Sequence, residues 1–84
     1  MAAARPRDPH PLDAAFGRAV RALRVERGLS QEALSFACGR HRTYVSGIER
    51  ATSSPTLGTM AVLAEALGVP TSELVRRAES LRDG

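Results

Sequence analysis

The chain has 84 residues, enough for one small domain with a modest hydrophobic core. Its formal charge is +3, and all 12 of its lysine-or-arginine positions are arginine, which is mild support for a nucleic-acid partner because a coding bias would have the same effect. The single cysteine excludes an intramolecular disulfide, and no apolar stretch is long enough to span a membrane.

Residues 1–11 contain three prolines and few bulky apolar side chains, which predicts a disordered arm ahead of a folded domain over residues 12–82. Arg5 and Arg7 would touch a DNA backbone or minor groove, or belong to an inert tail. The arm lacks the apolar segment of a signal peptide, so we expect a cytoplasmic protein.

The first helix is expected over about residues 13–27, opened by Leu12 or Asp13 and stopped by Gly28. Arg24 lies beside the apolar stripe of this helix, which is an unusual place for a charge. The stripe has helical spacing and consists of Phe16, Val20 and Leu23.

Ser30 is a good N-cap for a second helix, which Gly39 is expected to end. Leu29 and Leu34 occupy the positions of a hydrophobic staple. Cys38 fits a buried small apolar side chain, the alternative being a redox role. The small residues that would let a crossing helix approach this one are Ser35 and Ala37.

Arg40 or His41 is expected to open a third helix, with Val45 and Ile48 towards the core. Its other face has no obvious core to enter and carries arginine, threonine and serine, the side chains needed to read base edges in a DNA major groove. These polar residues are Arg42, Thr43, Ser46 and Arg50.

A fourth helix is expected to open at Pro55 or Thr56 and to stop at Gly68, and a fifth to open at Pro70 or Thr71. No strand alternation or internal repeat is present, so the sequence predicts an all-α fold of five helices. The apolar residues expected inward on the fourth helix are Leu57, Met60, Leu63, Ala64 and Leu67.

This order of motifs resembles the helix-turn-helix family of phage repressors and Cro, also called the xenobiotic-response-element family. The resemblance covers about residues 12–75 and implies a five-helix, repressor-like DNA-binding domain whose second and third helices form the helix-turn-helix. The matching segments are residues 23–24, 28–34, 44–50 and 63–69.

Residues 41–46 look especially like the recognition helix of restriction–modification controller proteins. Two features depart from these patterns. Ala51 stands where the family has a glycine after its Glu-Arg pair, so either a positive φ costs it about 1 kcal/mol or the helix end is rebuilt. Residues 52–54 are Thr-Ser-Ser where controllers tend to have a basic residue and asparagine.

Arg42 can donate two hydrogen bonds to guanine O6 and N7, the alternatives being a phosphate contact or a solvated surface position. Thr43 and Ser46 are short and would touch bases only where the helix sits deep in the groove. Their methyl and hydroxyl groups suit thymine methyls and mixed polar edges.

Five further residues are candidates for phosphate contacts. By resemblance Tyr44 places its hydroxyl on a phosphate, the alternative being a half-buried ring packed between helices. Gln31 begins the second helix, where free amide groups favour a phosphate. Arg40 and Arg50 flank the reading helix as phosphate clamps, and His41 caps the helix or contacts a phosphate.

Arg24 and Glu49 both lie on faces that otherwise point inward, and the resemblance implies that they form an internal salt bridge. The alternative is two independent exposed charges. If the pair is internal, removing one partner leaves a buried charge at a cost of about 3–5 kcal/mol.

An enzyme is not expected, because the histidines lie in a tail and a turn and the lone cysteine has no evident base. No metal-ligand spacing or nucleotide fingerprint occurs, so no cofactor is expected. We therefore expect a sequence-specific transcriptional regulator, of the restriction–modification controller type by resemblance, that binds a pseudo-palindromic site on double-stranded DNA. The alternatives are the antitoxin of a toxin–antitoxin pair and a protein-interaction module on the same fold.

A two-fold homodimer is also expected, since a domain this small has more apolar side chains near its C-terminus than its own packing obviously covers. By resemblance, small regulators of the family pair through this region. The residues assigned to the dimer interface are Leu67, Val69, Leu74 and Val75.

Overall fold

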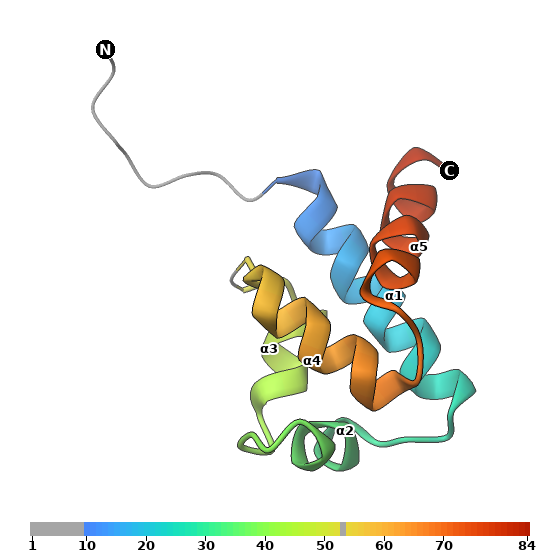
Figure 1. Ribbon diagram of the computed structural model, residues 1–84. Coiled ribbons are helices and arrows are strands. Elements are labelled where there is room, and N and C mark those ends of the chain that lie inside the picture. The colour runs from blue at the N-terminus through green and yellow to red at the C-terminus, as the bar shows by residue number, and fades with distance from the viewer. Residues whose placement is uncertain (1–9, 53) are drawn as a thin grey trace.

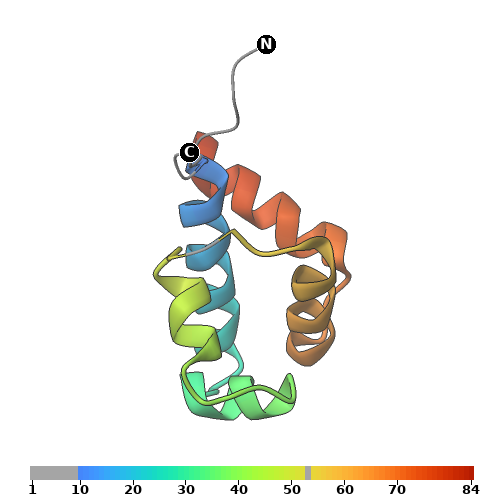
Figure 2. The same ribbon diagram turned by 90° about the vertical axis from the view of Figure 1, so that its left-hand side faces the viewer.

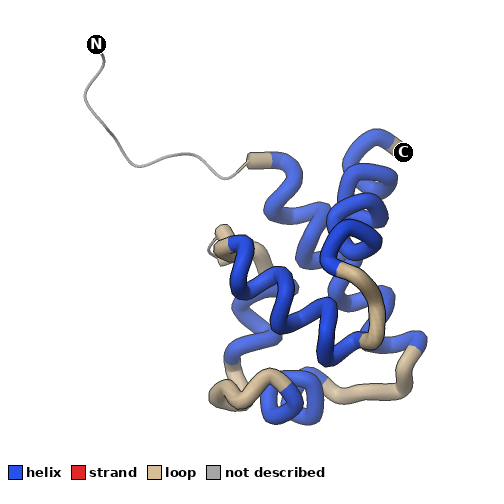
Figure 3. The backbone as a smooth tube through the Cα atoms, viewed as in Figure 1, coloured by secondary structure: helices blue, strands red, loops and turns tan. Residues whose placement is uncertain are grey.

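The computed structural model describes residues 10–52 and 54–84, and these form five helices with no strand (Figure 1). The expected all-α fold of five helices is confirmed (Figure 3). The helices are α1 (Pro11–Glu26), α2 (Gln31–Ala37), α3 (Tyr44–Glu49), α4 (Leu57–Leu67) and α5 (Thr71–Asp83).

α1 begins at Pro11 rather than at Leu12 or Asp13, because His10 acts as its N-cap. His10 Nδ1 accepts the N–H of Leu12 at 3.0 Å, and the Asp13 carboxylate accepts the N–H of His10 at 3.1 Å. Proline suits the first helical position, where its missing N–H is not needed. His10 and Pro11, which were assigned to the expected arm over residues 1–11, belong instead to the start of α1, and residues 1–9 lie outside the described part of the chain.

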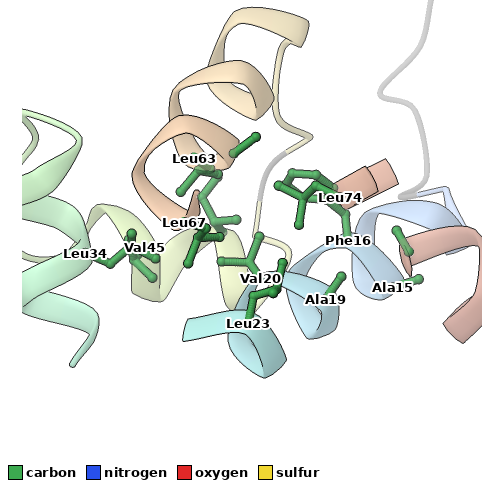
Figure 4. Close-up of a cluster of buried hydrophobic side chains, with 13 residues drawn as sticks. Ala15, Phe16, Ala19, Val20, Leu23, Leu34, Val45, Leu63, Leu67 and Leu74 are labelled. Atoms are coloured by element: carbon green, nitrogen blue, oxygen red, sulfur yellow. The ribbon is translucent and has the colours of Figure 1, made fainter. Parts of the chain in front are cut away.

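The helices enclose one hydrophobic core (Figure 4). Phe16, Val20 and Leu23 are buried in it, which confirms the stripe expected for the first helix. Leu29 and Cys38 are partly buried against the same core. Its fully buried leucines come from four helices and are Leu23, Leu34, Leu63, Leu67 and Leu74.

Two of these leucines were expected at a dimer interface, and that assignment is wrong. Leu67 and Leu74 are 1% and 0% exposed, because α4 and α5 turn them into the domain's own core. The inward position also expected for Leu67 is confirmed. The expectation for Leu57 is also wrong, because it was expected inward but is 72% exposed at the start of α4. Val69 and Val75 are half-buried.

The arrangement leaves one side of α3 open. Figure 2 shows α3 and α4 on opposite sides of the molecule, with α2 across the bottom and α5 crossing α1 at the top. A Cβ atom at Gly17 would lie 2.6 Å from the carbonyl oxygen of Ile48, so glycine lets α1 approach the C-terminal end of α3 closely. This contact fixes α3 against α1 and leaves its polar face accessible.

Across the described ranges, no helix combines the length and apolar character needed to cross a membrane.

Candidate nucleic-acid interface

A buried serine ties α2 to the start of α3. Ser35 is fully buried, and its Oγ accepts the N–H of Val45 at 3.1 Å and donates to the carbonyl of Arg42 at 3.3 Å. The sequence showed Ser35 only as a small residue that permits close approach. The signal available for its second role was a polar residue one position after the buried Leu34, on the core side of the helix.

The third helix begins at Tyr44, not at Arg40 or His41 as expected. His41 Nδ1 accepts the N–H of Thr43 at 3.2 Å, which holds residues 42–43 in a turn ahead of the helix. Thr43 is the N-cap residue, but its backbone is already in the right-handed helical region and its side chain makes no capping bond. His41 therefore caps the turn ahead of α3 and not the helix itself.

The polar residues expected to read bases lie in the turn before α3 and in its first turn. Arg42 and Thr43 are exposed ahead of the helix, and Ser46 is half-buried within α3. Arg50 is exposed at the end of α3, and its Nε donates to the carbonyl of Ser46 at 3.3 Å. The four residues therefore follow one another along the turn and α3, which Ser35 and Ile48 hold against the rest of the domain.

The hydroxyl of Tyr44 does not face solvent, so the expected phosphate contact is not the arrangement present. Its oxygen is buried and has no hydrogen-bond partner among the described residues, and the ring packs against the core. The Arg40 guanidinium lies 5.4 Å from the ring centroid, within the range of a cation–π contact. The half-buried ring, the second alternative for Tyr44, is the one that the structure contains.

Arg24 and Glu49 form a part-buried ion pair between α1 and α3. Arg24 Nε donates to Glu49 Oε2 at 2.6 Å, and a second bond joins its terminal nitrogen to Oε1 at 3.1 Å. The hydrogen bond to Glu49 raises the pKa of Arg24, although burial acts in the opposite direction. Arg24 also donates to the carbonyl of Leu29 at 2.8 Å, which anchors the segment that leads into α2.

Gln31 joins this pair instead of standing free. Its Nε2 donates to Glu49 Oε1 at 2.9 Å, so the first residue of α2 is linked to the last residue of α3. One amide hydrogen of Gln31 is therefore used inside the protein. The sequence placed Gln31 at the start of α2 but gave no sign of this bond, which depends on how the two helices pack.

Ala51 follows α3 with φ 56°, the only non-glycine residue with positive φ in the described part of the chain. Its N–H donates to the carbonyl of Ile48 at 3.1 Å, which closes the helix. Ala51 therefore keeps the positive φ of the family's glycine position, and the helix end is not rebuilt.

Cys38 is half-buried beside the turn between α2 and α3. Burial raises the pKa of its thiol, and the positive charge of Arg40 opposes this only in part. A raised pKa disfavours the reactive thiolate, which fits the apolar alternative for Cys38. Within residues 10–52 and 54–84, no group of three or more His, Cys, Asp or Glu side chains is arranged to hold a metal ion.

Comparisons with known proteins agree with this geometry. A family model described as helix-turn-helix matches residues 20–74. Control protein C.BamHI of Bacillus amyloliquefaciens is 43% identical over 61 residues, which cover 71% of this chain and 75% of that protein. The cryptic phage CTXphi transcriptional repressor RstR of Vibrio cholerae is 40% identical over 65 residues, or 77% of this chain and 59% of the repressor.

Among solved structures, the restriction-modification controller protein C.AhdI from Aeromonas hydrophila superposes with a TM-score of 0.69 at 43% identity. The match covers 73% of this chain and 92% of C.AhdI. The resemblance to helix-turn-helix repressors and controller proteins is thereby confirmed.

Proposed function

Because the chain belongs to the helix-turn-helix family of DNA-binding transcriptional regulators, we propose that it binds a pseudo-palindromic operator as a homodimer and controls the genes of a restriction–modification system. The observation that supports DNA reading best is the exposed pair Arg42 and Thr43, on a turn that is held by the buried Ser35 and by the exposed His41. Such rigidity suits base recognition, because a side chain reads a base only when its backbone is placed accurately.

In the proposed complex, α3 enters the major groove. Arg42 donates to guanine O6 and N7, while Thr43 and Ser46 contact thymine methyls or mixed polar edges. Arg40, His41 and Arg50 contact phosphates on either side, since all three are exposed around the reading face. The remaining amide hydrogen of Gln31, at the start of α2, donates to a phosphate of the DNA backbone.

The role in a restriction–modification system rests on similarity to proteins whose names describe them as control or controller proteins. The chain acts in the cytoplasm and without enzymatic activity, which is consistent with a family of regulators. Its specificity comes from α3 and much of its affinity from arginine–phosphate contacts.

The homodimer forms through the start of α4 and the groove beside it. Leu57 is 72% exposed, and an apolar groove of about 330 Å³ lies between α1, α5 and the segment that leads into α4. In a two-fold interface, Leu57 of each copy inserts into the partner's groove. The groove is lined by His10, Leu12, Asp13, Phe16, Pro55, Met60, Val75 and Ala78.

Selection of bound sites from random DNA, followed by fluorescence anisotropy across salt concentrations, tests DNA reading. We expect one enriched, two-fold-related sequence. The logarithm of its binding constant should fall linearly with the logarithm of salt, by about 0.9 per phosphate neutralised. Absence of any enriched sequence and of binding at low salt would contradict the proposal.

Two arginine variants separate base reading from phosphate contact. Arg42→Ala should lose about 1–3 kcal/mol of binding free energy and relax the preference at one base pair. Arg50→Ala should weaken all sequences equally and reduce the salt slope by about 1. Arg82→Ala, at the exposed C-terminal end of α5, is the matched control and should bind like the wild type. An Arg42→Ala protein that keeps every base preference would refute the assignment.

A further inference from the structure

A second exposed apolar surface lies on the side of α1 that points away from the core. Val25 is 59% exposed there, and Arg18, Arg21 and Ala22 are exposed beside it. Residues three and four positions apart are neighbours on a helix, so these four side chains form one patch about two turns long. Leu81, at the end of α5, is also exposed next to this patch. We call these five residues the α1 outer face.

The α1 outer face is open and only slightly hollowed. A shallow groove of about 470 Å³ is lined by Arg18, Arg21, Ala22, Val25 and Glu26. A smaller groove of about 200 Å³ lies between α1 and α5, where Ala22 and Leu81 are among the lining residues. Because Ala22 lines both grooves, they form one continuous surface with small apolar side chains at its centre.

The arginines of this face are not neutralised by the domain itself. Arg21 forms no ion pair with any residue of the two described ranges, and the bond of Arg18 goes to the carbonyl of Leu81, which carries no net charge. The carboxylate of Glu26 is shared between Arg27 and Arg77. Like charges three positions apart destabilise a helix slightly, so folding alone gives no reason for this pair of arginines.

We propose that the α1 outer face is a docking site for an acidic amphipathic helix of a partner protein. The apolar stripe of such a helix would cover Val25, Ala22 and Leu81, and its flanking carboxylates would reach Arg18 and Arg21. A helix laid in a shallow groove buries its apolar side chains there, and complementary charge at the rim sets its orientation.

The site is separate from the residues that read DNA. α1 meets α3 through Gly17 and Arg24, which are buried and half-buried, whereas all five residues of the α1 outer face are exposed. The exposed face of α3 is therefore left uncovered, and a partner on the α1 outer face can bind while DNA is held. This arrangement suits a regulator that recruits or is restrained by a second protein at its operator.

The test is an NMR titration of the ¹⁵N-labelled full chain. The ligand is a synthetic helical peptide of 18 residues with leucine along one face and glutamate along the opposite face. A peptide of the same composition in scrambled order, without an apolar stripe, is the control. We expect shifts confined to α1 and the end of α5. Val25→Ser and Arg21→Glu should each weaken binding roughly tenfold, whereas the scrambled peptide should bind far less.

Two matched variants control for general effects. Phe36→Ser removes an apolar side chain of similar exposure on α2, and Arg82→Glu reverses a charge outside the face. Both should bind the peptide as the wild type does. Because Val25 and Arg21 are exposed, their variants should keep the wild-type circular dichroism and melting temperature.

Three results would overturn the proposal: no binding of the acidic peptide, shifts centred on residues 40–50, or equal binding of the scrambled peptide. The second would mean that the peptide merely follows the arginines near α3. Fluorescence anisotropy with the selected operator then measures whether Arg21 also contacts DNA. Loss of DNA affinity and of salt slope in Arg21→Glu would assign Arg21 to a phosphate contact instead.

Discussion

Ala51 holds a backbone conformation that suits glycine, and its replacement should stabilise the protein. At φ 56° a Cβ atom costs about 1–2 kcal/mol, while glycine loses about 0.4–1 kcal/mol more chain entropy on folding. The difference predicts that Ala51→Gly raises the free energy of unfolding by about 1 kcal/mol. Urea denaturation measures this.

The control for Ala51→Gly is Ala14→Gly, at an exposed position inside α1. There the backbone is helical, so glycine should lower the stability by about 1 kcal/mol. If both variants are destabilised alike, the strain assigned to Ala51 is absent.

Glu49 is the residue on which three contacts converge, and its loss should be costly. Its side chain is 5% exposed and accepts hydrogen bonds from Arg24 and Gln31. Glu49→Ala leaves the Arg24 guanidinium, itself 12% exposed, without its partner, which should cost about 3–5 kcal/mol. Glu32→Ala, on an exposed face of α2, should change stability by about 0.5 kcal/mol or less. Equal melting temperatures for the two variants would show that the ion pair is not coupled to folding.

At the scale of elements, the link between α2 and α3 rests largely on Ser35. Ser35→Ala leaves the buried N–H of Val45 without an acceptor, so we expect a loss of about 1–3 kcal/mol. Ser72→Ala, exposed in the first turn of α5, is the matched control and should be nearly neutral. Thermal melts of the two variants measure this difference. A Ser35→Ala protein as stable as the control would show that Ser35 does not stabilise the link between α2 and α3.

The helices whose signals are local were predictable from the sequence. Ser30 and Gly68 mark the start of α2 and the end of α4 through a side-chain cap and a left-handed glycine, and both are where the sequence placed them. The start of α3 was missed by three or four residues, because the bond that the Thr43 N–H donates to His41 has no periodic signature.

Which apolar residues face the core was predictable only in part. Helical spacing identified the buried stripe of α1, but Leu57 and Leu74 were assigned to the wrong environments. Periodicity gives the relative direction of side chains on one helix, whereas the direction of the core depends on how α4 and α5 are placed by the other helices. The bond from Gln31 to Glu49 escaped notice for the same reason, since it joins two separate elements.

At the scale of the whole molecule, the proposed dimer would add stability to a small core. The described helices enclose a single core, and a domain of this length buries only about 60% of the surface that its unfolded chain exposes. A dimer that forms only from folded copies adds stability that grows with concentration. The melting temperature of this protein should therefore rise with its concentration if the proposed interface is correct.

Leu57 provides the direct check on the dimer. Leu57→Glu places a charge where we expect an apolar contact with the partner's groove, and the position is exposed enough to leave the monomer folded. Sedimentation at micromolar concentration should show a wild-type dimer and a monomeric variant. In the dimer the two reading helices would lie about 34 Å apart, one turn of DNA, so the variant should also lose most of its affinity for a full operator but little for a half-site. Val25→Glu adds the same charge on α1 and should still dimerise. A wild-type monomer at every concentration, or a Leu57→Glu protein that dimerises normally, would exclude this interface.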